Sequence, residues 1–140
     1  MNVSLRVRLA AAVVAAAPLL ALSPSSAPAS SLGCTWAPGT YASYVCVAIS
    51  GSGRYVSSVR VTRNKQYSSI CNYKAKFVVT SPSGLRKWRF YSPYHSGCSW
   101  NTAWMDIAVY RSFPDGSTAC GHWYEMGRWL PAVPCETIHA

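Results

Sequence analysis

Residues 118–136, TACGHWYEMGRWLPAVPCE, predict a β-hairpin in the last part of the chain. Residues that favour strands fill positions 118–125, and the Met126-Gly127 pair supplies the flexible centre of a turn. Residues 128–133 then return alongside the first strand. Two prolines interrupt this return strand, and proline cannot donate a ladder hydrogen bond. We therefore expect the return strand to lie at an edge of its sheet.

Two cysteines, Cys120 and Cys135, lie in the two arms of this hairpin. If Met126 and Gly127 alone form the loop, Cys120 faces Val133, and Cys135 is two positions out of register. The Cα atoms of bridged cysteines lie within about 7 Å of each other. A bridge between these two cysteines therefore requires a wider loop or a bulge.

Residues 1–29 have the pattern of a secretory signal peptide. A short basic start with Arg6 and Arg8 precedes an apolar run over residues 9–22, and a Ser/Pro-rich stretch ends in an A-x-A cleavage site at residues 27–29. The apolar run is shorter than the roughly 20 residues that a membrane span needs. We expect export and cleavage, which leave a secreted, extracellular protein without a membrane span.

All the cysteines follow the expected cleavage point, and exported chains meet an oxidising environment. We therefore expect three disulfides. Sequence alone leaves the pairing open, but nearest-neighbour pairs are favoured because each encloses one plausible hairpin or turn. The six cysteines, in that paired order, are Cys34 and Cys46, Cys71 and Cys98, and Cys120 and Cys135.

Metal binding and cofactors are not expected from these residues. No cysteine pair has the C-x-x-C spacing, and the three histidines do not form a zinc-finger arrangement with the cysteines.

The chain is strongly basic, with a formal net charge of +9, and most of this charge lies beyond the signal peptide. A basic surface favours anionic partners such as cell-wall polymers, nucleic acid, anionic glycans or an acidic protein face. Ordinary solubility is the alternative explanation.

Short β-prone runs, separated by Gly, Pro, Ser and Asn, account for nearly all of the chain after residue 30. These runs predict strands at residues 41–49, 55–63, 71–80, 85–91 and 104–110, and apolar and polar residues alternate in the last four. In the second run, Tyr55, Val59 and Val61 are the expected core face. This pattern predicts an all-β fold over residues 39–140, a small antiparallel β-sandwich or partly open barrel stabilised by three disulfides. Residues 30–38 are expected to form an extended arm.

Four basic residues would share one solvent-exposed face of the sheet if the strands at residues 71–80 and 85–91 pair. Alternation turns Lys74 and Lys76 outward from residues 71–80, and Lys87 and Arg89 outward from residues 85–91. The face is either a basic stripe for an anionic partner or the charge that a half-exposed sheet needs for solubility and edge protection.

Aromatic side chains are the candidates for binding. Residues 92–101 predict a loop around Cys98, and aromatic residues on an anchored loop offer a large contact area at low entropic cost. The alternation of residues 104–110 turns its aromatic residues outward, away from Ile107 and Val109. Folding back over a small core is the alternative. The candidate binding residues are Tyr94, His95, Trp100, Trp104, Tyr110 and Trp129.

Catalysis has weak support in the sequence. The best arrangement is His122, Glu125 and Arg128 in the terminal hairpin, which resembles the acid, base and anion-stabilising groups of a small secreted ribonuclease. In a regular strand, however, His122 and Glu125 point to opposite faces. We therefore expect no catalytic residues and a protein that is not an enzyme.

The expected signal peptide, the run GSGRYVSSVRV (residues 51–61) and the ending CGHWYEMGRWLPAVPCETI (residues 120–138) resemble the small cystine-braced secreted β-proteins of actinobacteria. In size and layout the chain is similar to the adaptor subunit of the secreted umbrella toxin particles. That resemblance implies a non-catalytic adaptor that links a lectin subunit to the stalk of a large toxin in competition between related bacteria. It transfers no functional residue.

Taken together, these patterns predict a secreted protein-interaction module whose partner is a larger extracellular protein. The alternatives are a lectin-like module that binds glycan or cell wall, a small secreted ribonuclease, and a protease inhibitor with residues 92–101 as its reactive loop.

Overall fold

The computed structural model describes residues 30–140, so the expected signal peptide (residues 1–29) lies outside the described residues. The described residues form strands and no helix, and therefore no helix that could cross a membrane. The strands are β1 (Ser31–Trp36), β2 (Ser43–Ser52), β3 (Tyr55–Thr80), β4 (Lys87–Tyr91), β5 (His95–Ser112), β6 (Ser117–Glu125), β7 (Arg128–Trp129) and β8 (Cys135–Ile138).

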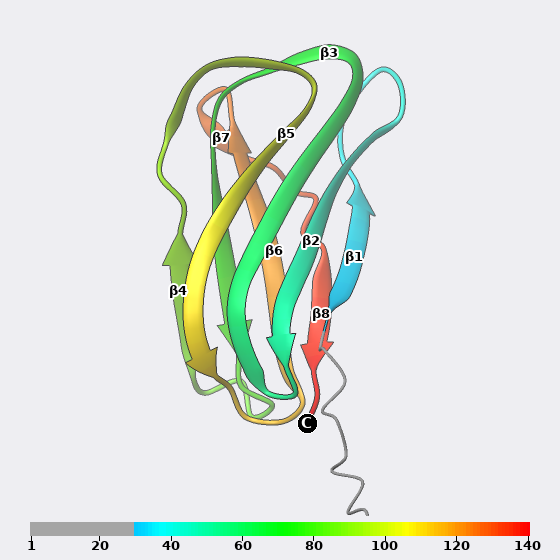
Figure 1. Ribbon diagram of the computed structural model, residues 1–140. Helices are drawn as coiled ribbons and strands as arrows, with labels where there is room; N and C mark the ends of the chain where they lie inside the picture. The colour runs from blue at the N-terminus through cyan, green and yellow to red at the C-terminus, as the bar shows by residue number, and fades with distance from the viewer. Residues whose placement is uncertain (1–29) are drawn as a thin grey trace, which may run out of the picture.

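The strands form two packed layers that share β3 (Figure 1). Residues 55–64 of β3 lie in the first layer, between β2 and β5, and β1 extends this layer beyond β2. Residues 73–80 of β3 lie in the second layer, between β4 and β6, and β7 and β8 pair with β6. Every pair is antiparallel, and the sheet does not close into a barrel. The expected all-β sandwich is confirmed.

The bend of β3 between the layers differs from the sequence expectation of two separate strands with a loop at residues 92–101. The strand bends without ending because β5 follows it around the bend, with Ser69 opposite Trp100 and Cys71 opposite Cys98. Register shifts accompany the bend on both sides of Cys71. Residues with positive φ supply the curvature: Tyr67, Asn72, Asn101 and Gly97.

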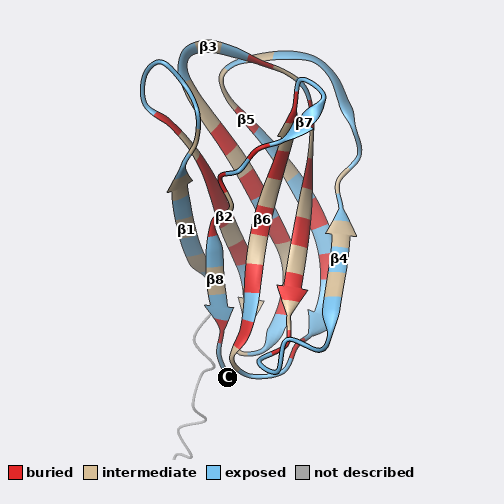
Figure 2. Ribbon diagram, turned by 180° about the vertical axis from the view of Figure 1, so that it is seen from behind, coloured by how far each residue is buried: buried red, intermediate tan, exposed pale blue. Residues whose placement is uncertain are grey.

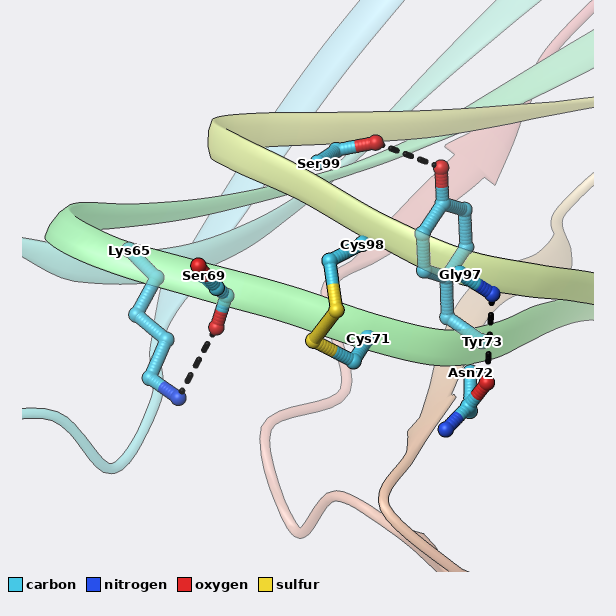
Figure 3. The surroundings of a disulfide bond; sticks show 8 residues. All are labelled: Lys65, Ser69, Cys71, Asn72, Tyr73, Gly97, Cys98 and Ser99. Carbon is cyan, nitrogen blue, oxygen red and sulfur yellow. Dashed lines mark hydrogen bonds between the residues drawn. A yellow bond between two sulfur atoms is a disulfide. The ribbon is translucent and has the colours of Figure 1, made fainter.

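The Cys71–Cys98 disulfide ties the two strands together at this bend (Figure 3). Beside it, the backbone N–H of Gly97 donates a hydrogen bond to Oδ1 of Asn72 over 3.2 Å. The hydroxyls of Tyr73 and Ser99 lie 2.8 Å apart and join the same two strands. The bend is therefore held covalently and by hydrogen bonds between β3 and β5.

The core fills the space between the layers and follows the alternation of each strand (Figure 2). Trp123 and Phe77 are its largest fully buried apolar side chains. At Gly121 the layers approach so closely that a Cβ atom there would lie 2.9 Å from Cβ of Val47. Glycine is therefore required at this position.

One expected core position is wrong. Tyr55 is exposed, and Val56 is buried in its place. The cause is a β-bulge between Val56 and Ser58, which shifts the alternation at the start of β3 by one residue. Val59 and Val61 follow the bulge and are buried as expected.

Residues 30–38 are not the extended arm that the sequence predicts. They contain β1, which pairs along its whole length with β2. The outer side of β1 lies against β8, where a Cβ atom on Gly33 would collide with a carboxylate oxygen of Glu136. The segment is therefore part of the first layer, and β1 and β8 cover each other's edges.

The three disulfides have the nearest-neighbour pairing favoured by the sequence, and no cysteine is free in residues 30–140. Each joins residues directly opposite each other on paired strands. Three such bridges indicate a domain that folds in an oxidising, extracellular-type environment.

The terminal hairpin has its turn where the sequence predicts it, but the return strand is shorter than the expected residues 128–133, because only Arg128 and Trp129 pair before the chain becomes irregular. Met126 and Gly127 form its turn with φ values of 50° and 84°. Tyr124 pairs with Trp129, but Cys120 pairs with Cys135, so the irregular segment 130–134 adds the two residues that the disulfide requires. β7, the part of the expected return strand that forms, pairs only with β6 among residues 30–140 and ends the strand order of the sheet, so it lies at an edge as expected.

A buried ion pair joins the two layers near the bend. The Arg63 side chain on β3 is fully buried, and its Nε and Nη2 lie 3.3 and 3.4 Å from the carboxylate oxygens of Glu125 on β6. Arg63 also donates to Oγ of Ser43 and to the carbonyl of Pro38, and Glu125 accepts from Nε1 of Trp123. The sequence analysis did not identify this pair.

Replacing Arg63 with Met should destabilise the domain by about 3 to 5 kcal/mol, because Glu125 would remain buried without its countercharge. Urea denaturation measures the loss. The double replacement R63M/E125L should cost less than the sum of the two single changes, because it removes both charges. Additive losses would show that the two side chains are not coupled.

Replacing Cys71 and Cys98 with Ser should lower the free energy of unfolding by about 3 kcal/mol, since this bridge, with a sequence separation of 27, closes the longest of the three disulfide loops in residues 30–140. Thermal unfolding of C71S/C98S with and without reductant measures the effect. C34S/C46S, which opens a shorter loop between β1 and β2, is the control and should lose less. Equal stability of C71S/C98S and the unmodified protein would contradict a bracing role at the bend.

Candidate functional site

The outer edge of β5 is the longest unpaired strand edge among residues 30–140. Along the first layer, β5 pairs with β3 on one side and has no strand on the other. The neighbouring β4 belongs to the second layer and pairs only with β3. Backbone groups on the outer side of β5 therefore face solvent, and an extended segment of another chain can pair with them.

Most candidate binding residues lie on or next to β5. Trp100, Trp104 and Tyr110 belong to the strand and are 63%, 54% and 73% exposed. The predicted outward phase of residues 104–110 agrees with this exposure. Tyr110 lies in the bulge near the end of β5, where its φ is 47°.

Tyr94 and His95 lie where the chain enters β5. Tyr94 is exposed, and the ring of His95 stacks on Tyr73 with 4.5 Å between centroids. Tyr73 stacks in turn on the buried Trp123. The His95 ring therefore covers part of the core, and Tyr94 is the freer of the two side chains.

Trp129 is separate from the other candidates. It lies on β7 in the second layer, where Nζ of Lys76 is 4.5 Å and Nζ of Lys74 is 5.7 Å from its ring centroid. Lys74 also lies 4.8 Å from the ring of Tyr124. These cation–aromatic contacts hold the lysine side chains on the outer surface of the second layer.

The expected basic face is present on this outer surface. The pairing of β3 with β4 places Lys87 opposite Thr80 and Arg89 opposite Val78, so both share a face with Lys74 and Lys76. Glu125 of the neighbouring β6 points into the core. The geometry suits an anionic partner, and its use remains a prediction.

The proposed catalytic set is not brought together. Glu125 is buried in the ion pair with Arg63, whereas His122 lies on the outer face and Arg128 is exposed in β7. Burial, and then the charge of Lys76 directly opposite, lower the pKa of His122 below its usual value. The separation of His122 from Glu125 agrees with the alternation argument.

On the first layer, an exposed ion pair lies beside Trp104. Nε of Arg60 donates to Asp106 over 2.7 Å, and the guanidinium lies 5.8 Å from the Trp104 ring centroid. The hydrogen bond from Arg60 lowers the pKa of Asp106. Arg60 and Asp106 therefore neutralise each other's charge beside the exposed Trp104 ring.

A group of outward residues on the first layer was missed by the sequence analysis. Trp36 is 77% exposed, and its ring meets that of Tyr44 edge-on with 6.3 Å between centroids. The signal was available, because direct pairing of Cys34 with Cys46 fixes Trp36 opposite Tyr44. Treating residues 30–38 as an arm hid it.

No metal centre forms in residues 30–140, since no group of three or more His, Cys, Asp or Glu side chains comes together there. Comparison with known proteins gives no match to a protein-family model, to a curated protein or to a solved structure.

The His122 pKa gives the stability a pH dependence. Because the folded state holds this pKa below the unfolded value of about 6.5, the unfolded chain binds a proton first as pH falls. We expect the melting temperature to fall as the pH is lowered from 7 to 5, because the unfolded chain takes up the proton over this range before the folded state does. The decrease should be smaller in His122→Gln. His95→Gln, an exposed histidine of β5, is the matched control. An unchanged slope in His122→Gln would contradict this assignment.

Proposed function

We propose that this protein is a secreted, non-catalytic protein-interaction module that binds an extended segment of a larger extracellular protein along β5. The observation that carries the proposal is the unpaired outer edge of β5 with exposed aromatic residues along it. Backbone hydrogen bonds to an added strand provide affinity, and the side chains that flank the edge provide specificity.

The edge lacks two of the residue types that usually prevent strand addition, and its bulge and the charged Arg111 lie only at the far end of the strand. Residues 102–112 contain no proline and no lysine, and the charged pair of Asp106 with Arg60 points to the outer face of the sheet. The opposite side of the sandwich differs, because β1 and β8 lie against each other there. Only one long side of the sandwich thus offers an open edge of this length in the described residues.

The partner that we propose is a large secreted polypeptide, with an adaptor role between a toxin stalk and a lectin as its most specific form. The support for this form is the resemblance in size and layout to the umbrella toxin adaptors. The three disulfides agree with an extracellular setting.

The test is capture of partners by the tagged protein from its native culture supernatant, with identification by mass spectrometry. The double variant W100A/Y110A should lower recovery of the partner about tenfold or more, because exposed aromatic residues dominate contact energies. Trp129→Ala removes an exposed aromatic residue from the other layer and is the matched control.

Hydrogen exchange distinguishes strand addition from other docking modes. On binding, the amides of β5 that do not pair with β3 should become protected, whereas those of β4 should not. Full recovery of the partner by W100A/Y110A, or unprotected β5 amides in the complex, would overturn the proposal. A strictly monomeric protein with nuclease activity would do the same.

A further inference from the structure

A row of outward side chains crosses all four strands of the first layer near the bend. The register places Trp36 of β1 opposite Tyr44 of β2, Tyr44 opposite Asn64 of β3, and Asn64 opposite Thr102 of β5. With strands about 4.8 Å apart, the row is about 14 Å wide. It therefore forms one continuous strip across the sheet, perpendicular to the strands.

The surface is hollowed along this strip. Trp36 and Tyr44 line one open hollow of about 350 Å³, together with Cys34 and Thr35. A second hollow of about 330 Å³ lies on the other side of Tyr44. Its lining residues are Ala42, Tyr44, Asn64, Gln66, Asn101 and Thr102. Each hollow has the size of a small ligand subsite, for which about 300 Å³ is the lower bound.

The polar groups of the second hollow are oriented in advance. Oδ1 of Asn64 accepts a hydrogen bond from Oγ1 of Thr102, and Oδ1 of Asn101 accepts one from the backbone N–H of Tyr67, both over 2.8 Å. No hydrogen-bond acceptor within residues 30–140 is bonded to the side-chain NH₂ group of either asparagine. Each amide thus has a fixed orientation and two N–H donors available to a ligand.

The adjacent row of outward residues across the same four strands contains no charged side chain. The Cys34–Cys46 disulfide lies beside Thr62, which pairs with Trp104. The disulfide and Thr62 are small, and they lie between Trp36 on β1 and Trp104 on β5. No charged residue lines either hollow, which argues against an anionic ligand at this site.

We propose that this strip binds a neutral oligosaccharide that lies across the four strands, with one sugar ring on Trp36 and another, further along the sugar chain, over Asn64 and Asn101. The apolar C–H face of a pyranose packs on an aromatic ring, and its hydroxyl oxygens accept hydrogen bonds from the amide N–H groups. A polyproline peptide also packs on aromatic rings but has fewer acceptors, so the two oriented asparagine amides favour a sugar. This glycan site is independent of the proposed role of the β5 edge.

The experiment titrates the ¹⁵N-labelled protein with neutral gluco-, xylo-, manno- and chito-hexaoses and records its side-chain N–H resonances. A binding sugar should shift the Trp36 indole N–H and the NH₂ groups of Asn64 and Asn101. The indole signals of buried Trp123 and of Trp129 on the other layer should not move. These signals report the site directly.

Variants separate the contributions. Trp36→Ala should weaken binding about tenfold or more, and Asn64→Asp should weaken it about fivefold, since the aspartate keeps the acceptor for Thr102 but loses the two donors. Tyr110→Ala, at the β5 edge, is the control and should bind as the unmodified protein does. The melting temperatures should remain unchanged because Trp36 is exposed.

Three results would overturn the proposal. The first is that no hexaose shifts the Trp36 and asparagine resonances at millimolar concentration. The second is binding that survives in Trp36→Ala. The third is a proline-rich peptide that shifts these resonances when no sugar does. The Tyr110→Ala control separates this test from that of the proposed function. This variant can lose capture of the protein partner at the β5 edge and still bind the sugar.

Discussion

The buried pair of Arg63 and Glu125 is the constraint on which the arrangement of the two layers depends. Its members come from β3 and β6, on opposite sides of the core, and they close a network with Ser43 and Pro38. A buried charge without its partner is strongly destabilising. The pair therefore holds the first-layer part of β3 across the core from the end of β6. It lies just before the point at which β3 bends into the second layer.

Local pattern was enough to predict much of the fold. Alternation correctly assigned Val59 and Val61 to the core, and cysteine order correctly gave the three pairs. The bend of β3 was not predictable, because the run of residues 64–70 reads as a polar connection when β5 is not known to follow it. Arg63 was missed for a related reason. Its phase matches Val59 and Val61, but a charged residue is assigned to solvent unless its partner is known.

The candidate site was predictable in part. The alternation correctly predicted that Trp104 and Tyr110 point outward. Together with Trp100, these two residues belong to one strand, β5. What the sequence could not give is that this strand has no neighbour on one side, since an open edge depends on strands that pair elsewhere. The Trp36 strip needed the register between β1 and β2, which becomes known only when Cys34 is placed opposite Cys46.

A strand that belongs to both layers also affects how the domain bears load. Pulling on a segment bound along β5 acts first on the ladder between β5 and β3, and β3 transfers that force through the bend into the second layer. The Cys71–Cys98 bridge prevents the two strands from separating progressively past the bend. The two layers therefore cannot separate without breaking β3 or its ladders, so the domain bears load as a single unit.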